Sequence, residues 1–343
     1  MPLPTAARED QIAEQVLGGD VRLGARLIRD LDDATPLSQA VLRRIWPHAG
    51  RAFLIGVTGN PGAGKSTVVD GLIAHYRQAG HRVGVVAIDP SSPFSGGAIL
   101  GDRIRMQRHA LDDGVFIRSL ASRGHLGGLS RSTGEVVAVL DAMGFDIVLI
   151  ETVGVGQGEV EVVALADTKV VVTVPGLGDE VQAIKAGILE IADVLVVNKA
   201  DREGADRTVR DLMTMLELRH SASPGPRTTP EATTPEAPIP EAPTSEVEII
   251  RTVATRADGV ADLAAAIDRH REKTAHRATA RRKLRARREL RESLLDLLTR
   301  QVDALLLAQP DCVAAVERRQ IDPYSAAERL LQQFLGTADL GTG

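Results

Sequence analysis

A glycine-rich segment near residue 60 restricts the possible folds of this chain more than any other stretch. Residues 59–66 read GNPGAGKS and fit the pattern G-x-x-x-x-G-K-[ST] at every defined position. The apolar residues 52–57 before it are typical of a short buried strand, and residues 68–76 place apolar positions at helical spacing. A strand, a glycine-rich loop and a helix in this order predict a Walker A phosphate-binding loop, with a chance glycine-rich turn as the weaker alternative.

Each residue type in this loop has a physical role in binding phosphate. The glycines let successive backbone N–H groups point into one concavity, and the N-terminus of the following helix adds partial positive charge. Lys65 is expected to bridge the outer phosphates as a catalytic residue, and Ser66 to ligate Mg²⁺. The predicted phosphate-binding residues are Gly59, Asn60, Pro61, Gly62, Ala63, Gly64, Lys65, Ser66 and Thr67.

Apolar runs alternate with helical segments between residues 53 and 266. Such runs, rich in Val, Ile and Leu and separated by helices, predict an α/β fold with a mostly parallel sheet covered by helices on both faces. Two or three short amphipathic helices are expected between Thr5 and Trp46. The seven strand-like runs are FLIGVT, RVGVVAI, GVFIRSL, FDIVLI, KVVVTV, DVLVVN and EVEIIRTV.

Changes in composition suggest three regions. We expect an N-terminal helical extension over residues 1–48, a phosphate-loop domain over 49–270 and a C-terminal helical region over 271–343. Residues 221–245 are rich in Pro, Thr, Ala and Glu, which predicts a disordered insertion between two strands. From His270 onward the pattern predicts one long helix, first charged and then apolar.

The apolar stripe of this last helix favours packing against a partner subunit, and its basic first part is more typical of a solvated face than of an RNA-binding arm. The stripe consists of Leu294, Leu295, Leu297, Leu298, Val302, Leu305 and Leu306.

Composition excludes several classes of protein. The net charge of −5 and the 2% aromatic content argue against nucleic-acid binding. One cysteine, Cys312, rules out an internal disulfide framework or a cysteine-rich metal site. No apolar run approaches the roughly 20 residues that span a bilayer, and the N-terminus lacks a signal pattern, so we expect no membrane association and a cytoplasmic protein.

A second motif predicts the base of the nucleotide. Asn198-Lys199-Ala200-Asp201 follows the run DVLVVN and matches N-K-x-D, in which the aspartate accepts hydrogen bonds from the ring N–H and the exocyclic amine of guanine. Adenine presents no such pair of donors. The sequence therefore predicts GTP and GDP as ligands, with the Ala254 N–H as a weaker candidate to meet the guanine carbonyl oxygen.

The segment after the run FDIVLI predicts the hydrolytic centre. Glu151 stands where an acid that reaches Mg²⁺ is expected, and the Gly154 N–H is expected to meet the γ-phosphate. Val155 follows this glycine where small signalling GTPases have a water-positioning Gln, so intrinsic hydrolysis should be slow. Asp89, at the end of RVGVVAI, is expected near Mg²⁺. From position alone, Asp102 is equally consistent with the metal site and with a helix N-cap.

Four blocks of sequence together resemble the MeaB/ArgK group of P-loop GTPases, relatives of the human methylmalonic aciduria type A protein. The resemblance covers most of the chain, and the second block is the most specific because phosphate binding alone does not require it. The blocks are GNPGAGKST, IDPSSPFSGGAILGDRIRM, IETVGVGQGEVEV and PGLGDEVQAIKAGILEIADVLVVNKAD.

The resemblance implies a GTPase chaperone of an adenosylcobalamin-dependent acyl-CoA mutase, with methylmalonyl-CoA mutase the expected partner. It implies that Ser66, Asp89, Asp102 and Glu151 surround Mg²⁺, and that the C-terminal helices form a homodimer. It does not imply that this chain binds cobalamin, since no D-x-H-x-x-G motif is present.

The resemblance also implies an additional switch loop at residues 176–185. Gln182 and Lys185 are candidates to approach the phosphates there, and a polar helix face is the alternative for both.

Two other functions are kept as alternatives. A metal-insertion GTPase would carry Cys/His clusters, whereas here the histidines are scattered and Cys312 is alone. A protein kinase of the amino-acid transport type would need a second substrate pocket with an acceptor-activating base, and no motif for one is found.

Overall fold

The computed structural model describes residues 5–33, 35–89, 106–109, 111–121, 126–152, 165–176, 191–222 and 247–338. The chain divides into two compact units, residues 1–286 and 287–343, which are described separately below.

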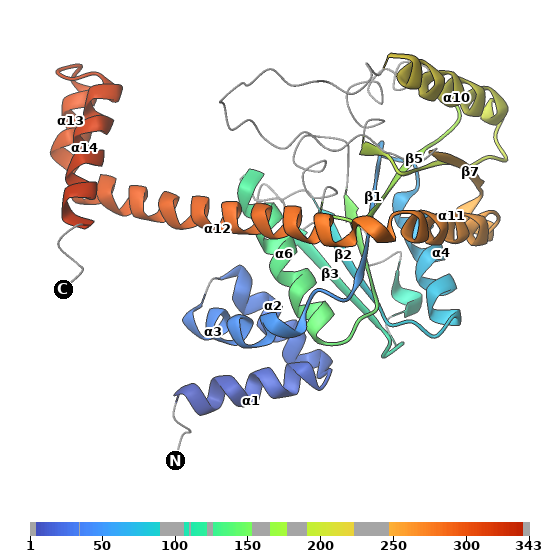
Figure 1. Cartoon of the computed structure of the whole chain (residues 1–343), viewed down its shortest axis with the longest axis horizontal. Helices are drawn as coiled ribbons and strands as arrows, with labels where there is room; N and C mark the ends of the chain where they lie inside the picture. The colour runs from blue at the N-terminus through green and yellow to red at the C-terminus, as the bar shows by residue number, and fades with distance from the viewer. Residues whose placement is uncertain are drawn as a thin grey trace. The chain divides into compact units, whose positions relative to one another are not determined.

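The first unit is built on a seven-stranded parallel sheet with the order β3-β2-β4-β1-β5-β6-β7. Figure 1 shows this sheet together with its helices. All seven strands predicted from apolar runs are present, which confirms the α/β fold. The strands are β1 (Phe53–Gly59), β2 (Val83–Asp89), β3 (Val115–Ala121), β4 (Ile147–Thr152), β5 (Thr168–Thr173), β6 (Val194–Asn198) and β7 (Glu248–Thr252).

Helices cover both faces of this sheet, because the central strands are apolar on both sides. Side chains of β1, β4 and β5 pack on one face against α4 (Lys65–Gln78) and α11 (Val260–Lys273). The opposite face of β4 and β2 packs against α6 (Leu126–Ala142) and the N-terminal helices, while β5 and β6 pack against α10 (Ala205–Ala222). This arrangement leaves the carboxyl ends of the strands as the edge where ligands bind in such folds.

Three N-terminal helices confirm the predicted cap: α1 (Thr5–Leu17), α2 (Val21–Asp32) and α3 (Pro36–Ile45). Helix α2 begins where the Asp20 carboxylate accepts a hydrogen bond from the Leu23 N–H, at 2.9 Å. An ion pair between Arg118 Nη2 on β3 and Asp32 Oδ2, 2.7 Å long, connects this cap to the edge of the sheet. The cap therefore belongs to the same unit as the sheet.

The long helix expected from His270 onward is interrupted, which corrects that prediction. Helix α11 ends at Lys273, a 3-10 turn spans Ala275–Arg277, and α12 then runs from Ala278 to Ala308. Thr274 explains the break, since its hydroxyl donates to the His270 carbonyl at 2.7 Å and accepts a hydrogen bond from Arg281 Nη1 at 2.9 Å. Side-chain bonding of this kind competes with continuation of the helix.

The second unit contains α12 from Arg287 onward, α13 (Pro310–Glu317) and α14 (Pro323–Ala338). Helix α10 overlaps the predicted disordered insertion at residues 221 and 222, and the rest of that insertion lies outside the described residues. The short turns not mentioned above are the 3-10 segments Trp46–His48, Gln107–His109 and Ala254–Arg256. Among the described residues, no helix is both long and apolar enough to cross a membrane.

Candidate nucleotide site

The glycine-rich loop joins β1 to α4 at the carboxyl edge of the sheet, as the sequence predicts. Two of its glycines are required by close approach as well as by positive φ. A Cβ on Gly59 (φ 142°) would lie 2.0 Å from the Val172 carbonyl oxygen, and one on Gly64 (φ 87°) would lie 2.5 Å from Asn198 Nδ2. The loop is therefore packed against β5 on one side and against the N-K-x-D segment on the other.

Lys65 is folded back over this loop. Its ammonium group is buried and donates hydrogen bonds to the carbonyl oxygens of Gly59 (2.8 Å) and Asn60 (3.0 Å). A buried ammonium needs such acceptors, and phosphate oxygens would be stronger ones because they carry charge. The geometry thus places a cation inside the concavity where the outer phosphates are expected.

Ser66 and Glu151 come together from distant parts of the chain. The Ser66 hydroxyl, in the first turn of α4, donates to Glu151 Oε1 on β4 at 2.6 Å, and both side chains are buried. Their backbones meet because β1 and β4 are neighbours, with Val57 opposite Glu151 in the register. The two oxygens predicted to serve Mg²⁺ are therefore side by side.

A pair of hydroxyl groups holds the end of β4 next to this site. Thr152 Oγ1 donates to Thr58 Oγ1 at 2.9 Å, and both threonines are fully buried. Thr152 follows Glu151 directly, so this bond restrains the backbone that carries the Glu151 carboxylate. Sequence patterns did not indicate this role.

Hard oxygen ligands are what a Mg²⁺ ion prefers, and one or two carboxylates with a hydroxyl are typical of nucleotide sites. The Ser66 and Glu151 oxygens therefore fit Mg²⁺. Asp89 ends β2 at the same edge, but its side chain is outside the described part of the structure, and so is Asp102. Within the described ranges, no group of three or more His, Cys, Asp or Glu side chains could hold a metal ion.

Asn198 connects the phosphate loop to the strand ends on the far side of the site. Its amide Nδ2 donates to the Ala63 carbonyl at 2.8 Å, and its Oδ1 accepts from the Thr252 hydroxyl (3.0 Å) and the Ala254 N–H (3.2 Å). The side chain is 3% exposed. Asn198 therefore acts as a brace between two loops, and the role of the Ala254 N–H at guanine stays a prediction.

Lys199 and Asp201 follow on the same turn. Lys199 has a positive φ of 55°, and its ammonium donates to the Gly62 carbonyl at 2.8 Å, which places its stem along the phosphate loop. The Asp201 carboxylate is half-exposed, and its Oδ2 lies 3.7 Å from Arg256 Nη1. The predicted phosphate-binding and base-reading residues thus share one edge of the sheet.

Arg256 is a residue that the sequence reasoning passed over. It lies in the quoted stretch RTVATRADGV, two positions after Ala254, and its guanidinium Nε donates to Asp258 Oδ2 at 2.9 Å. The pKa of Arg256 is raised, first by the hydrogen bond and charge of Asp258 and more weakly by Asp201. The signal available in the sequence was an arginine two positions after Ala254, the residue predicted to meet guanine.

Four predicted residues cannot be placed. Gly154, Gln182 and Lys185 lie outside the described residues, as does Asp102. Their roles at the γ-phosphate, in the switch loop and at the metal stay predictions.

The chain is similar to known proteins in sequence and in fold. A protein of Pyrococcus horikoshii whose name describes it as a GTPase is 44% identical over 329 residues, covering 95% of this chain and 98% of that protein. The GTPase ArgK of Escherichia coli is 46% identical over 165 residues, covering 48% of this chain and 50% of that protein. A solved structure described as a LAO/AO transport system kinase is similar in fold, with a TM-score of 0.66, 24% identity and coverage of 97% of this chain and 100% of its own.

The family model described as "Methylmalonyl Co-A mutase-associated GTPase MeaB" matches residues 25–306, which include the phosphate loop, Glu151 and the N-K-x-D segment. The match spans most of the chain, and the Pyrococcus horikoshii and Escherichia coli relatives are both named as GTPases. The protein therefore belongs to the MeaB family and is a GTPase.

Proposed function

We propose that this protein is a GTP-hydrolysing chaperone that regulates cofactor loading and protection of an adenosylcobalamin-dependent acyl-CoA mutase. The observation that supports this most is the family match across residues 25–306, because the description of that family names methylmalonyl-CoA mutase as the associated enzyme. A mouse relative named methylmalonic aciduria type A homolog is 46% identical over 149 residues, covering 36% of its own length. Methylmalonyl-CoA mutase is the first partner to test.

At the site, Lys65 would hold the outer phosphates, and Ser66 and Glu151 would hold Mg²⁺ with Asp89 and Asp102. When bound, Mg²⁺ would supply positive charge that stabilises the transferring phosphoryl group. Asp201 would read guanine and Gly154 would meet the γ-phosphate. The buried hydrogen bond between Ser66 and Glu151 supports the metal role, since it holds two suitable oxygens 2.6 Å apart.

Slow intrinsic turnover is part of this proposal. Val155 has no group to orient a water molecule, so fast hydrolysis requires a further group brought in by ordering of nearby segments. Gln182 and Lys185 are the residues we assign to that role, in the presence of the partner. A partner that responds to the nucleotide must bind the GTP and GDP forms with different affinity.

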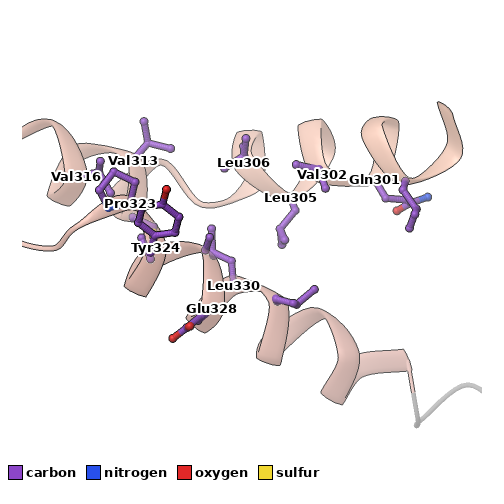
Figure 2. A pocket seen from close by; sticks show the side chains of 15 residues that line it. Gln301, Val302, Leu305, Leu306, Val313, Val316, Pro323, Tyr324, Glu328 and Leu330 are labelled. Atoms are coloured by element: carbon purple, nitrogen blue, oxygen red, sulfur yellow. The ribbon is translucent and has the colours of Figure 1, made fainter. Parts of the chain in front are cut away.

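The second unit would form a homodimer. A cavity of about 700 Å³ opens between the end of α12, α13 and α14, and its lining is almost entirely apolar (Figure 2). Leu298, which lines this cavity, and Leu294 and Leu297 on the same helix are about half exposed, at 54%, 50% and 59%. Apolar surface of this extent is typical of a protein interface, and a second copy of the same helices would cover it.

The test is GTP turnover by the purified protein with Mg²⁺, measured alone and with methylmalonyl-CoA mutase from the same source. We expect a slow basal rate that rises when the mutase is added. In Lys185→Ala the basal rate and GTP affinity should be retained while the stimulation is lost. Lys273→Ala, which removes a half-exposed lysine of α11, is the matched control and should be stimulated normally.

A basal rate that does not change with the mutase would reject this partner but leave the GTPase activity in place. Equal loss of basal and stimulated rates in Lys185→Ala would defeat the switch-loop assignment. The dimer is checked separately by analytical ultracentrifugation, in which Leu298→Glu should shift the protein toward the monomer.

A further inference from the structure

The loop after β7 is closed by its own backbone, so the side chains it carries have fixed positions. The Val253 N–H donates to the Asp258 carbonyl at 3.0 Å, and the Arg256 N–H donates to the Val253 carbonyl at 2.9 Å. Gly259, with φ 75°, ends the loop where a Cβ would lie 2.0 Å from the Arg251 carbonyl oxygen. This closed loop carries Ala254 and Arg256 on the side of the N-K-x-D turn.

The guanidinium group of Arg256 has an acidic partner on each side, one hydrogen-bonded and one at ion-pair distance. Nε donates to Asp258 Oδ2 at 2.9 Å, and Nη1 lies 3.7 Å from Asp201 Oδ2. Because the guanidinium is planar and rigid, fixing Nε through Asp258 also fixes the direction in which Nη1 points. Asp258 therefore acts as a brace that directs the cation toward Asp201.

The Asp201 carboxylate has few other restraints. It is 45% exposed, and in the described part of the chain no other side chain forms an ion pair or hydrogen bond with it. Without Arg256, a half-exposed aspartate would sample several rotamers and lose that freedom on binding a base.

We propose that Arg256 is a specificity-determining positioning residue of the guanine site. It holds Oδ2 of Asp201 and leaves the other oxygen and the remaining lone pairs to accept the ring N–H and the exocyclic amine of guanine. Asp258 positions Arg256. This inference rests on the role proposed above for Asp201 as the reader of guanine.

The physical alternative is that Arg256 weakens nucleotide binding, and the experiment below distinguishes the two effects. The edge of guanine that carries the ring N–H and the amine has the same donor arrangement as a guanidinium group. If Arg256 competed with guanine for Asp201, removing it would tighten nucleotide binding. The positioning role requires the reverse sign.

The experiment compares guanosine diphosphate with inosine diphosphate, which lacks only the exocyclic amine, by calorimetric titration of the full-length protein without any partner. In Arg256→Ala the Kd for guanosine diphosphate should rise about two- to fivefold, the range typical of an exposed ion pair, and the Kd for inosine diphosphate should change less. The discrimination between the two nucleotides should therefore fall. Arg256→Lys, which keeps the charge but not the planar fork, should lie between Ala and the original protein.

Arg251→Ala is the matched control. It removes another half-exposed arginine, which lies near the end of β7 and pairs with Asp206 of α10 at 2.6 Å. This change does not involve Asp201, so both Kd values should stay the same. Thermal unfolding of each variant checks that the fold is retained. In a protein that already carries Asp201→Asn, adding Arg256→Ala should have no further effect on guanosine diphosphate binding.

Three outcomes would each overturn the proposal. They are tighter binding of guanosine diphosphate by Arg256→Ala, an unchanged ratio of the two Kd values, and an equal loss of affinity when Arg256→Ala is added to Asp201→Asn. These results are independent of any mutase. If the expected Kd changes are observed but the mutase does not stimulate GTP turnover, the proposed partner is rejected and the role of Arg256 is retained.

Discussion

The two edges of the same sheet bury polar groups in different ways. At the carboxyl edge, Lys65 is bonded to backbone carbonyls and Ser66 to Glu151, contacts that phosphate oxygens or a metal ion could replace. The amino edge is formed by the amino ends of the strands. There the buried polar groups Thr168, Asp193 and His270 contact one another or Lys169. This second group is defined here as the amino-edge cluster.

The side chains of the amino-edge cluster provide hydrogen-bond partners for one another. Thr168 Oγ1 and His270 Nδ1 are hydrogen-bonded at 2.7 Å, and Asp193 Oδ2 accepts from both the backbone N–H (2.9 Å) and the ammonium (3.0 Å) of Lys169. Asp193 Oδ1 also lies 3.5 Å from His270 Nε2. Buried polar groups at the carboxyl edge are thus those predicted to bind a ligand, whereas those at the amino edge hold β5, β6 and α11 together.

The largest effect that would sharpen this contrast is expected for Lys65→Ala. Removing the cation from the phosphate loop should lower GTP affinity about 100-fold or more, because charge-assisted bonds to phosphate are strong. Thermal unfolding should shift little. Lys169→Ala, a lysine on the same sheet at the opposite edge, is the control: it should lower stability and leave GTP binding intact, and loss of binding in both variants would break the contrast.

The second effect is on stability at the amino edge. Asp193→Ala leaves His270 and Lys169 without their buried acceptor, and should lower the free energy of unfolding by about 2–4 kcal/mol. Urea unfolding measures this change, with GTP affinity as the parallel readout that should not move. Asp206→Ala, which removes a side chain 70% exposed, should cost about 0.5 kcal/mol or less. A loss of GTP affinity in folded Asp193→Ala would contradict the division between the edges.

A smaller effect is expected for Ser66→Ala. This change removes one of the two oxygens assigned to Mg²⁺, so GTP affinity measured with Mg²⁺ should fall about tenfold. With a chelator in place of Mg²⁺, the affinities of Ser66→Ala and the original protein should be similar. The same loss in both conditions would show that Ser66 acts through the fold of the loop and not through the metal.

The smallest effect is a pH dependence at the amino edge. Burial lowers the pKa of His270 below its ordinary value of 6.5, an effect that Asp193 opposes. The unfolded chain then binds a proton on His270 at a higher pH than the folded protein does, so this contribution to stability is complete above about pH 6.5 and is lost as the pH falls. Urea unfolding at about pH 7.5 and about pH 5.5 should show a smaller loss in His270→Gln than in the original protein. An equal loss in both would assign the pH dependence to other groups.

Local patterns predicted the elements of this fold well, because each one depends on residues close together in the chain. The seven apolar runs became the seven strands, and GNPGAGKS formed the loop between β1 and α4. The helix expected from His270 onward failed at Thr274, where the hydroxyl bonds the preceding turn and receives Arg281. Helical spacing continues through that point, so periodicity alone could not show the break.

The sequence by itself determined that the chain has a phosphate loop, an N-K-x-D motif and an apolar-run pattern for a parallel sheet, since each is encoded within a few neighbouring residues. Tertiary structure alone decided the pairings that give those motifs their chemistry. Ser66 meets Glu151 across 85 residues because β1 and β4 are adjacent in the strand order. Asn198 reaches Ala63, and Arg256 reaches Asp201, because the loops after β6 and β7 end at the same edge of the sheet. Strand order is set by packing of the whole core, which no local pattern records.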